Sequence, residues 1–200
     1  MARLSTGVDK VASTKRPRLS AAESRERILA AARREFSRAG FDQLGVRELA
    51  AAAAVDPAMI IRLFGSKEAL FAAVAQGAFA LEGPFTGGAS GLAARIAEHL
   101  TQKPPEQAPT DFDEFQFLMR SAASPAAAPL LSAALHAGFI APLAKILGGK
   151  EAALRAALLT ACVLGFSTLR FALGSETLER AARRRIGERL SAALQACLDE

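Results

Sequence analysis

The side chains with recognisable binding chemistry gather in one short segment, residues 57–64, which reads PAMIIRLF. On a helix that turns by about 100° per residue, Ile60 and Phe64 share one direction, which we assign to the core. The opposite side then carries Ala58, Met59, Ile61 and Arg62. The Arg62 guanidinium can hydrogen-bond a base edge or a phosphate, whereas its three apolar neighbours can only press on thymine methyl groups. The segment therefore has the chemistry of a helix that contacts DNA through few hydrogen-bond donors.

Two short helices joined by a tight turn would position that segment. Residues 46–53 carry apolar and small residues on one face, and Asp56-Pro57 is a helix start with an N-cap followed by proline in the first turn. The intervening turn contains Val55, an apolar residue that can pin it against the core. This order predicts a DNA-binding helix-turn-helix motif at about residues 45–64.

The basic charge lies in the same part of the chain. Residues 1–70 carry 13 Lys and Arg against 8 Asp and Glu, whereas residues 71–200 carry 12 against 12, so the whole net charge of +5 belongs to the first third. This distribution is typical of a polyanion-binding head on a neutral body, although a solvated surface has the same charge. Residues 1–19 show no apolar period, and we expect a basic disordered arm, either a plain tail or one that enters a minor groove.

The composition favours helices along the whole chain. Apolar residues make up 51% of the sequence, chiefly Ala and Leu, which have high helix propensity. Capping residues such as Ser20 and Ser66, together with Gly and Pro, predict about nine helices. We expect an all-α fold with an N-terminal three-helix helix-turn-helix domain at residues 20–70 and a C-terminal helical bundle at residues 71–200. The segment GPFTGGASG (83–91) is predicted to be a hinge or a boundary, and KPPEQAP (103–109) a linker.

Several other classes of protein are disfavoured. Cys162 and Cys197 form no CxxC pair or metal-ligand spacing, so we expect buried free thiols in a reducing compartment, with a disulfide as the less favoured alternative. No signal peptide is visible, and the longest apolar run, residues 156–166, is too short to cross a bilayer, which predicts a cytoplasmic protein. Neither His99 nor His136 follows a Glu by three residues, and no nucleophile elbow, P-loop or dinucleotide fingerprint occurs. We predict no catalytic residues, metal or cofactor.

Residues 24–71 resemble the DNA-binding domain of the TetR family of bacterial transcriptional regulators. The matching elements, in order, are RILAAARREF, AGFD, VRELAAAA, Asp56-Pro57 and RLFGSKEAL. The resemblance implies a nucleoid-associated homodimer that binds a palindromic operator in double-stranded DNA, usually as a repressor released by a small-molecule effector. By position, it implies phosphate contacts for Arg47 and Lys67 beside the recognition helix. A DNA-associated regulator of the same fold without an effector is the alternative.

The chain departs from the family pattern at the site itself. Ala54 stands where the turn usually has Gly, Ile61 where the family usually has Tyr, and Leu63 where it often has His. Leu44-Gly45 replaces a Thr or Ser that usually touches phosphate. Because each change removes a donor or a turn preference, we predict weaker or less base-specific binding than a typical member shows.

The body, about residues 117–198, more loosely resembles a C-terminal domain type of the same family, through RSAASPAAAPLL, LAKILGG and LRAALLTACVLGFSTLRFAL. That resemblance implies ligand binding and dimerisation. Within residues 112–120, Phe112, Phe115, Leu118 and Met119 sit at helical spacing and indicate a core stripe. Phe117 and Arg120 fall off this stripe, so we expect them to line a cavity or to be exposed. The predicted lining of a pocket for a small apolar effector is Phe115, Met119, Arg120, His136, Phe139, Phe166 and Arg170.

Two predicted helices at the C-terminus, about residues 151–173 and 176–198, carry small and apolar residues at every third or fourth position. Two such helices from each of two subunits would form a four-helix bundle. Alternatively, these stripes pack within one subunit. The predicted dimer interface is Leu158, Ala161, Gly165, Leu169, Ile186, Leu190 and Leu194.

Overall fold

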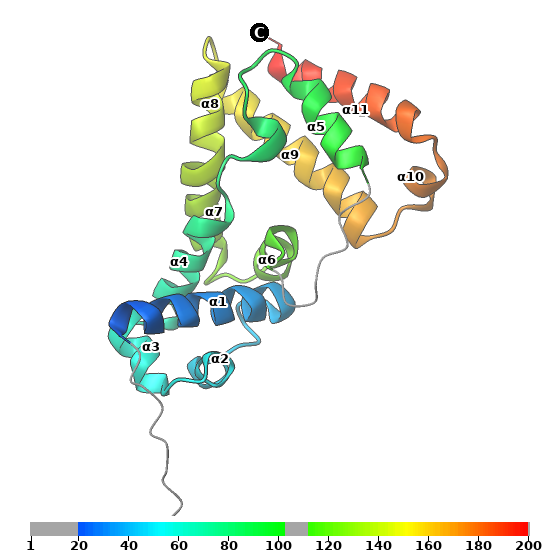
Figure 1. Ribbon diagram of the computed structural model, residues 1–200. Coiled ribbons are helices and arrows are strands. Elements are labelled where there is room, and N and C mark those ends of the chain that lie inside the picture. The colour runs from blue at the N-terminus through cyan, green and yellow to red at the C-terminus, as the bar shows by residue number, and fades with distance from the viewer. Residues whose placement is uncertain (1–19, 103–111, 200) are drawn as a thin grey trace, which may run out of the picture.

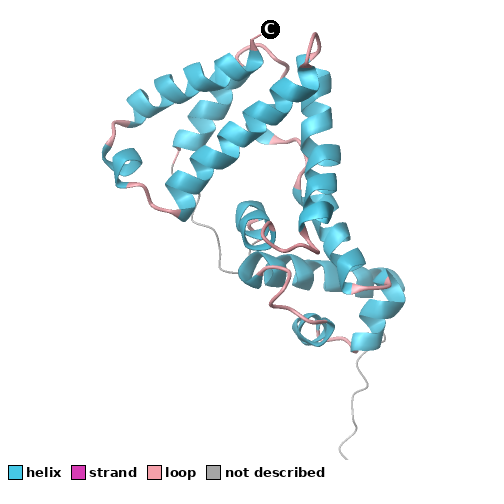
Figure 2. Cartoon of the chain, turned by 180° about the vertical axis from the view of Figure 1, so that it is seen from behind, coloured by secondary structure: helices cyan, strands magenta, loops and turns pink. Residues whose placement is uncertain are grey.

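The computed structural model describes residues 20–102 and 112–199, and every regular element in these two ranges is helical (Figures 1 and 2). The predicted arm (1–19) and linker (103–109) lie outside the described residues. The first four helices are α1 (Ala21–Ala39), α2 (Val46–Ala53), α3 (Pro57–Phe64) and α4 (Lys67–Ala78). After the short 3-10 turn η1 (Gly83–Phe85) come α5 (Leu92–Thr101) and α6 (Glu114–Ser121).

Two long helices follow, each interrupted by a π-helical turn. The first consists of α7 (Ala128–Leu135), η2 (His136–Ile140) and α8 (Ala141–Leu147), and the second of α9 (Ala152–Ser167) and η3 (Thr168–Ala172). The chain ends with α10 (Glu176–Arg180) and α11 (Arg183–Leu198). In Figure 1 the head, α1 to α3, lies at the bottom, α6 lies between head and body, and α5, α9 and α11 pack together at the top.

The all-α fold and the helix starts read from the sequence are confirmed. Ser20 and Glu23 form a capping box, in which the Ser20 N–H donates to the Glu23 carboxylate at 2.7 Å and the Glu23 N–H donates to Ser20 Oγ at 3.1 Å. These bonds lower the pKa of Glu23 because they favour its charged form. Asp56 and Ser66 likewise accept hydrogen bonds from the first turns of α3 and α4.

The described residues form ten helices when the interrupted ones are counted once, rather than nine. The predicted helix over residues 176–198 is divided, because Ala181 and Ala182 leave the helical region with ψ of 142° and 127°. This break lets α11 lie along α5, where Leu194 is buried. Alanine has high helix propensity, so packing against α5 overrides the local preference here.

The glycine-rich segment 83–91 is held in place rather than being a free hinge. The guanidinium of Arg95, on α5, donates to the backbone carbonyl oxygens of Pro84 at 3.3 Å, Thr86 at 3.0 Å and Gly88 at 2.6 Å, and also to that of Ser90. One half-buried arginine thereby satisfies four loop carbonyls, which fixes the path from α4 to α5.

An aromatic cluster joins the head to the body. Phe117 of α6 is fully buried, with its ring centroid 4.9 Å from that of Phe71 and 6.5 Å from that of Phe36. The expectation that Phe117 lines a cavity or is exposed is therefore wrong. Helix α6 is rotated so that Phe117 enters the head core, and the core continues into α7 through Leu131 and Ala134.

Polar contacts and a close backbone approach fasten α6 to the end of α1. Ser37 Oγ donates to the Asp113 carbonyl oxygen at 3.0 Å and accepts from the Asp113 N–H at 3.2 Å. Gly40 has φ of +77°, and a Cβ added there would lie 2.6 Å from the carbonyl oxygen of Arg120. A domain boundary at residues 70/71 falls inside α4, whose side chains contribute to this same shared core.

Two sequence expectations about the body need correction. Helices Ala128–Leu147 and Ala152–Ala172 have 20 and 21 residues and are long and apolar enough to cross a membrane, so a length argument does not exclude spans. The cysteines are free but not buried as expected, since Cys162 is exposed and Cys197 is half-buried, and their Sγ atoms lie 3.6 Å apart. Packing of α9 against α11 brings the two together despite their separation in the sequence.

Substituting Gly40 by alanine should destabilise the protein more than the same change at Gly65. Both glycines have positive φ, +77° and +89°, but a Cβ at Gly65 would meet nothing within 4 Å. Gly65→Ala should therefore cost only backbone strain of about 1–3 kcal/mol, whereas Gly40→Ala should cost about 2 kcal/mol more because α1 and α6 must separate. Urea denaturation measures both losses, and equal losses would contradict the close approach of α6.

Candidate nucleic-acid interface

Helix α3 presents the predicted face to solvent. Ile60 is fully buried in the head core, while Ala58, Ile61 and Arg62 are exposed, Ile61 by 48%. Met59 is half-buried at the edge, and the Arg62 guanidinium donates to its Sδ at 2.8 Å. The helical phase assigned from the sequence is thus the observed one. Three exposed or half-exposed apolar side chains surround one arginine, a surface with little hydrogen-bonding capacity toward base edges.

The turn between α2 and α3 carries a conformation that suits glycine better than the residue present. Ala54 has φ of 50° and ψ of 49°, in the left-handed region. An L-residue held there is strained by roughly 1 kcal/mol. The turn is closed by the Val55 N–H, which donates to the Ala50 carbonyl oxygen at 3.0 Å, and Val55 packs against the head core. The departure noted at Ala54 therefore alters the stability of the turn and not its shape.

The start of α2 offers backbone donors beside a basic side chain. Gly45 is the N-cap and supplies no side-chain cap, and its own N–H donates to the Glu48 carboxylate at 3.0 Å. Arg47 is exposed in the first turn. Free N–H groups at a helix start favour anions, and Arg47 adds a full positive charge there. The arrangement suits a phosphate group.

Lys67, whose ammonium the sequence predicts to contact phosphate, makes two hydrogen bonds inside the head. Its ammonium donates to the carbonyl oxygens of Phe41 at 3.2 Å and Leu44 at 3.0 Å, and lies 3.8 Å from the centroid of the Phe41 ring. Two of its three donors are therefore committed within the head. Lys67 ties the first turn of α4 to the loop before α2, and so positions Arg47 indirectly.

Arg25, near the start of α1, is a basic residue beside α3 that sequence reasoning missed. Its guanidinium lies 4.6 Å from the centroid of the Phe64 ring at the end of α3, and the residue is exposed. Its place off the apolar stripe of α1 indicates a solvent-facing side chain. Only the packing of α1 against α3 shows that Arg25 belongs to the surface formed by α2 and α3. Arg25, Arg47 and Arg62 give the α2–α3 side of the head three exposed positive charges.

The body holds an apolar cavity of about 310 Å³ between α4, α6, η2 and α9. Phe115 and Phe139, both predicted, line it together with Phe79, Phe85 and Leu118. Its polar groups are few and come from His99, Glu114, Thr160 and Ser167. Such a lining is typical of a site for a small, weakly polar molecule.

The other predicted pocket residues lie outside this cavity. Met119, Arg120 and His136 are exposed, and Phe166 packs against the second core, which is built from α5, α8, α9 and α11. Because Phe117 enters the head core, α6 turns Met119 and Arg120 outward. The π-helical turn η2 likewise carries Phe139 to the cavity and His136 to solvent.

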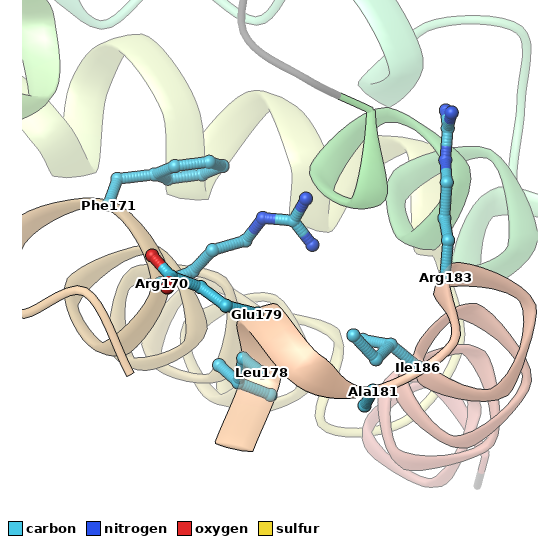
Figure 3. A pocket seen from close by; sticks show the side chains of 7 residues that line it. All are labelled: Arg170, Phe171, Leu178, Glu179, Ala181, Arg183 and Ile186. Atoms are coloured by element: carbon cyan, nitrogen blue, oxygen red, sulfur yellow. The ribbon is translucent and has the colours of Figure 1, made fainter. Parts of the chain in front are cut away.

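Arg170 lines a separate cavity of about 280 Å³ beside α10 and the start of α11. Figure 3 shows Arg170 and Phe171 on one side of it and Ala181 and Ile186 on the other. The Arg170 guanidinium donates to the Thr101 carbonyl oxygen at 3.1 Å. It therefore joins η3 to the end of α5 and does not reach the apolar cavity.

The predicted dimer residues divide into an exposed and a buried set. On α9, Leu158 is 48% exposed, and Leu169, in the π-helical turn η3 that continues α9, is 51% exposed; Ala161 and Gly165 are exposed between them, and Leu154 is 51% exposed. We call these five residues the α9 strip. On α11 the prediction places three residues, but Leu194 is fully buried, Ile186 is nearly so and Leu190 is half-buried. Leu194 and Ile186 pack against the subunit's own helices and are not available to a partner.

A helix-turn-helix head with an exposed, arginine-bearing second helix, joined to a larger helical domain with its own cavity, defines a DNA-binding transcriptional regulator rather than an enzyme. Residues 28–74 match the family described as bacterial regulatory proteins, tetR family, and residues 91–198 match the tetracyclin repressor-like C-terminal domain. The chain belongs to the TetR family. No curated protein sequence matches it.

Several solved structures share this fold over most of the chain. A TetR-family regulator from Streptomyces coelicolor A3 is 25% identical, with a TM-score of 0.55 over 92% of this chain and 99% of that one. Salmonella enterica GusR is 22% identical, with a TM-score of 0.57 over 88% and 95%. A transcriptional regulator from Pseudomonas aeruginosa PAO1 is 19% identical, with a TM-score of 0.60 over 90% and 93%.

The family match also identifies the role of the two long apolar helices. Both Ala128–Leu147 and Ala152–Ala172 lie within the matched C-terminal domain, residues 91–198. Each supplies residues to a buried core, such as Leu143 and Leu159. They are core helices of the ligand domain rather than membrane spans.

Lys67→Met should destabilise the head, because it removes two hydrogen bonds from a charged donor while keeping the apolar stem against Phe41. We expect the free energy of unfolding to fall by about 2 kcal/mol in urea denaturation. Lys150→Met, at an exposed lysine before α9, should leave it unchanged. Unaltered stability of Lys67→Met combined with weaker DNA binding would instead assign Lys67 to phosphate.

Proposed function

We propose that this regulator is a homodimeric repressor, acting in the cytoplasm at the nucleoid. It binds a palindromic operator through α3 of each subunit and leaves it when a small apolar molecule enters the cavity of the body. The observation that carries the proposal is the double role of α6. One side of this helix enters the head core, and the other forms a wall of the cavity.

The coupling between cavity and head follows from the side chains of α6. Phe115 and Leu118 line the cavity, while Phe117 is buried among the aromatic rings of the head. Phe79, the residue that caps the end of α4, lies in both places, since it lines the cavity and its ring centroid is 6.2 Å from that of Phe117. A molecule that displaces Phe115 or Phe79 must therefore move helices to which the head is fastened. A ligand shifts the DNA affinity only by its preference for one arrangement over the other.

Operator binding would depend mainly on phosphate contacts. The exposed face of α3 offers a single guanidinium, so base-edge hydrogen bonds are scarce. Arg25, whose guanidinium lies beside the Phe64 ring, and Arg47, exposed in the first turn of α2, would neutralise phosphates of the same operator. Binding of this kind is strongly salt-dependent, because each neutralised phosphate releases counterions.

The α9 strip supports the dimer. Its leucines are about half exposed. Apolar surface in contact with water is unfavourable by roughly 25 cal/mol per Å², so covering the strip lowers the free energy. Ala161 and Gly165 let a second helix approach closely in the middle of the strip. Together with α11, two copies would make a four-helix bundle. A two-fold axis through this bundle would give the two heads the symmetry of a palindrome.

A selection of genomic DNA fragments with the purified protein tests the operator. Enrichment of one palindrome, with half-sites about one helical turn apart, supports the proposal, and enrichment of no sequence or of unpaired sites contradicts it. The same palindrome then serves to distinguish the alternative function, a regulator without an effector. If no small apolar compound lowers the affinity for the palindrome, the alternative holds.

Arg62→Ala should weaken operator binding by about 10-fold or more, because the face loses its one donor to bases or phosphate. If the contact is to phosphate, the slope of log affinity against log salt should also become shallower by about one unit. Fluorescence anisotropy over a series of salt concentrations measures both. Arg180→Ala, which removes an exposed arginine of α10 that pairs with Glu176, is the control and should bind as before.

Leu158→Glu should separate the subunits, because it places an unpaired charge in the middle of the α9 strip. We expect the dimer dissociation constant in sedimentation experiments to rise by about 100-fold. Ala153→Glu changes an exposed residue of α9 that lies off the strip and should remain dimeric. A wild-type protein that sediments as a monomer at all concentrations would overturn the dimer.

A further inference from the structure

The two cysteines of the chain meet at the contact between α9 and α11. Their Sγ atoms are 3.6 Å apart, and the Cys197 thiol also lies 3.6 Å from the Ala193 carbonyl oxygen, one turn earlier on α11. Cys162 is exposed to solvent, and Cys197 is half-buried behind it. The sequence contains two cysteines in all, so each thiol has one possible partner within the subunit.

We propose that Cys162 and Cys197 are an oxidisable pair that forms a reversible disulfide within the subunit when the protein meets a hydroperoxide. A disulfide bond is about 2 Å long, so the sulfur atoms need to approach by only about 1.5 Å. The helices that carry them are already packed against each other. Rotation of the two side chains can supply most of this movement, without unfolding.

The reaction is expected to begin at Cys162. Burial raises the pKa of Cys197, and its hydrogen bond with Cys162 raises that pKa further, so Cys197 is less ionised than a free cysteine would be. The exposed Cys162 thiolate attacks one peroxide oxygen, the O–O bond breaks, and the other oxygen leaves as water or an alcohol after protonation. Cys162 is then a sulfenic acid.

Cys197 completes the reaction. Its sulfur attacks the Cys162 sulfur, the S–O bond of the sulfenic acid breaks, and the oxygen leaves as water with the proton of the Cys197 thiol. The two thiols have together given two electrons to the peroxide. A dithiol reductant restores both thiols by exchange. Disulfides in reducing compartments are usually transient and redox-sensing, which agrees with a pair that stands reduced at rest.

The pair goes beyond the proposed function and does not depend on it. Cys162 follows Ala161 of the α9 strip, so pairing of subunits would compete with the oxidant for this surface. If the dimer covers Cys162, its oxidation becomes slower. The product stays the same, because Cys162 is open to attack whenever the subunits separate. The proposal is therefore tested by the final product of oxidation.

The test treats the reduced full-length protein with hydrogen peroxide and follows it by intact mass, thiol counting and non-reducing gel electrophoresis. We expect both thiols to disappear, the mass to fall by two hydrogen atoms, and the chain to migrate as a single subunit. Dithiothreitol should restore both thiols. Survival of both thiols, addition of oxygen without loss of hydrogen, or a covalent link between two chains through Cys162 would each overturn the proposal.

Single substitutions provide the matched controls. In Cys197→Ser, Cys162 should still react but gain oxygen instead of losing hydrogen, because no resolving thiol is in reach. In Cys162→Ser, Cys197 should react several-fold more slowly than Cys162 does in Cys197→Ser. If Cys197 reacts as fast as Cys162, the assigned order of attack is wrong.

Discussion

The structure depends on one contact, the seating of α6 against the end of α1. Phe117 completes the aromatic cluster of the head, and Gly40 removes the side chain that would otherwise strike the Arg120 backbone. Helix α6 is only eight residues long. When one of its sides packs into the head core, the directions of the side chains on its other side are fixed as well. The cavity lining, the outward turn of Met119 and Arg120, and the link from body to head all follow from this seating.

Local signals along the chain were sufficient for the head. Caps at Ser20, Asp56 and Ser66 act within one turn of their own helices, so they can be read from neighbouring residues alone. The phase of α3 was equally accessible, because the alternation of Ile60 with its neighbours fixes which side is buried. These features require no knowledge of distant contacts.

Long-range packing decided the features that sequence reasoning missed. The break at Ala181 has no local signal, since alanine favours a helix, and it exists because α11 is packed along α5. Lys67 is similar: a basic residue at a helix start resembles a phosphate ligand until the loop before α2 folds onto it and supplies two carbonyl oxygens. Phe117 was assigned by spacing within one helix, whereas its environment comes from α1 and α4.

The π-helical turn η2 shows why the cavity could not be located from periodicity. Gly138 lies in this turn, and a Cβ there would come 2.5 Å from the Phe79 carbonyl oxygen, so the turn and the end of α4 touch at the backbone. The extra residue of a π turn shifts the helical phase. Phe139 consequently faces the cavity, its ring centroid 4.7 Å from that of Phe85, and packs against both hydrophobic cores. A ligand beside Phe139 would therefore act where the two cores meet, which is the place from which a small displacement reaches both head and body.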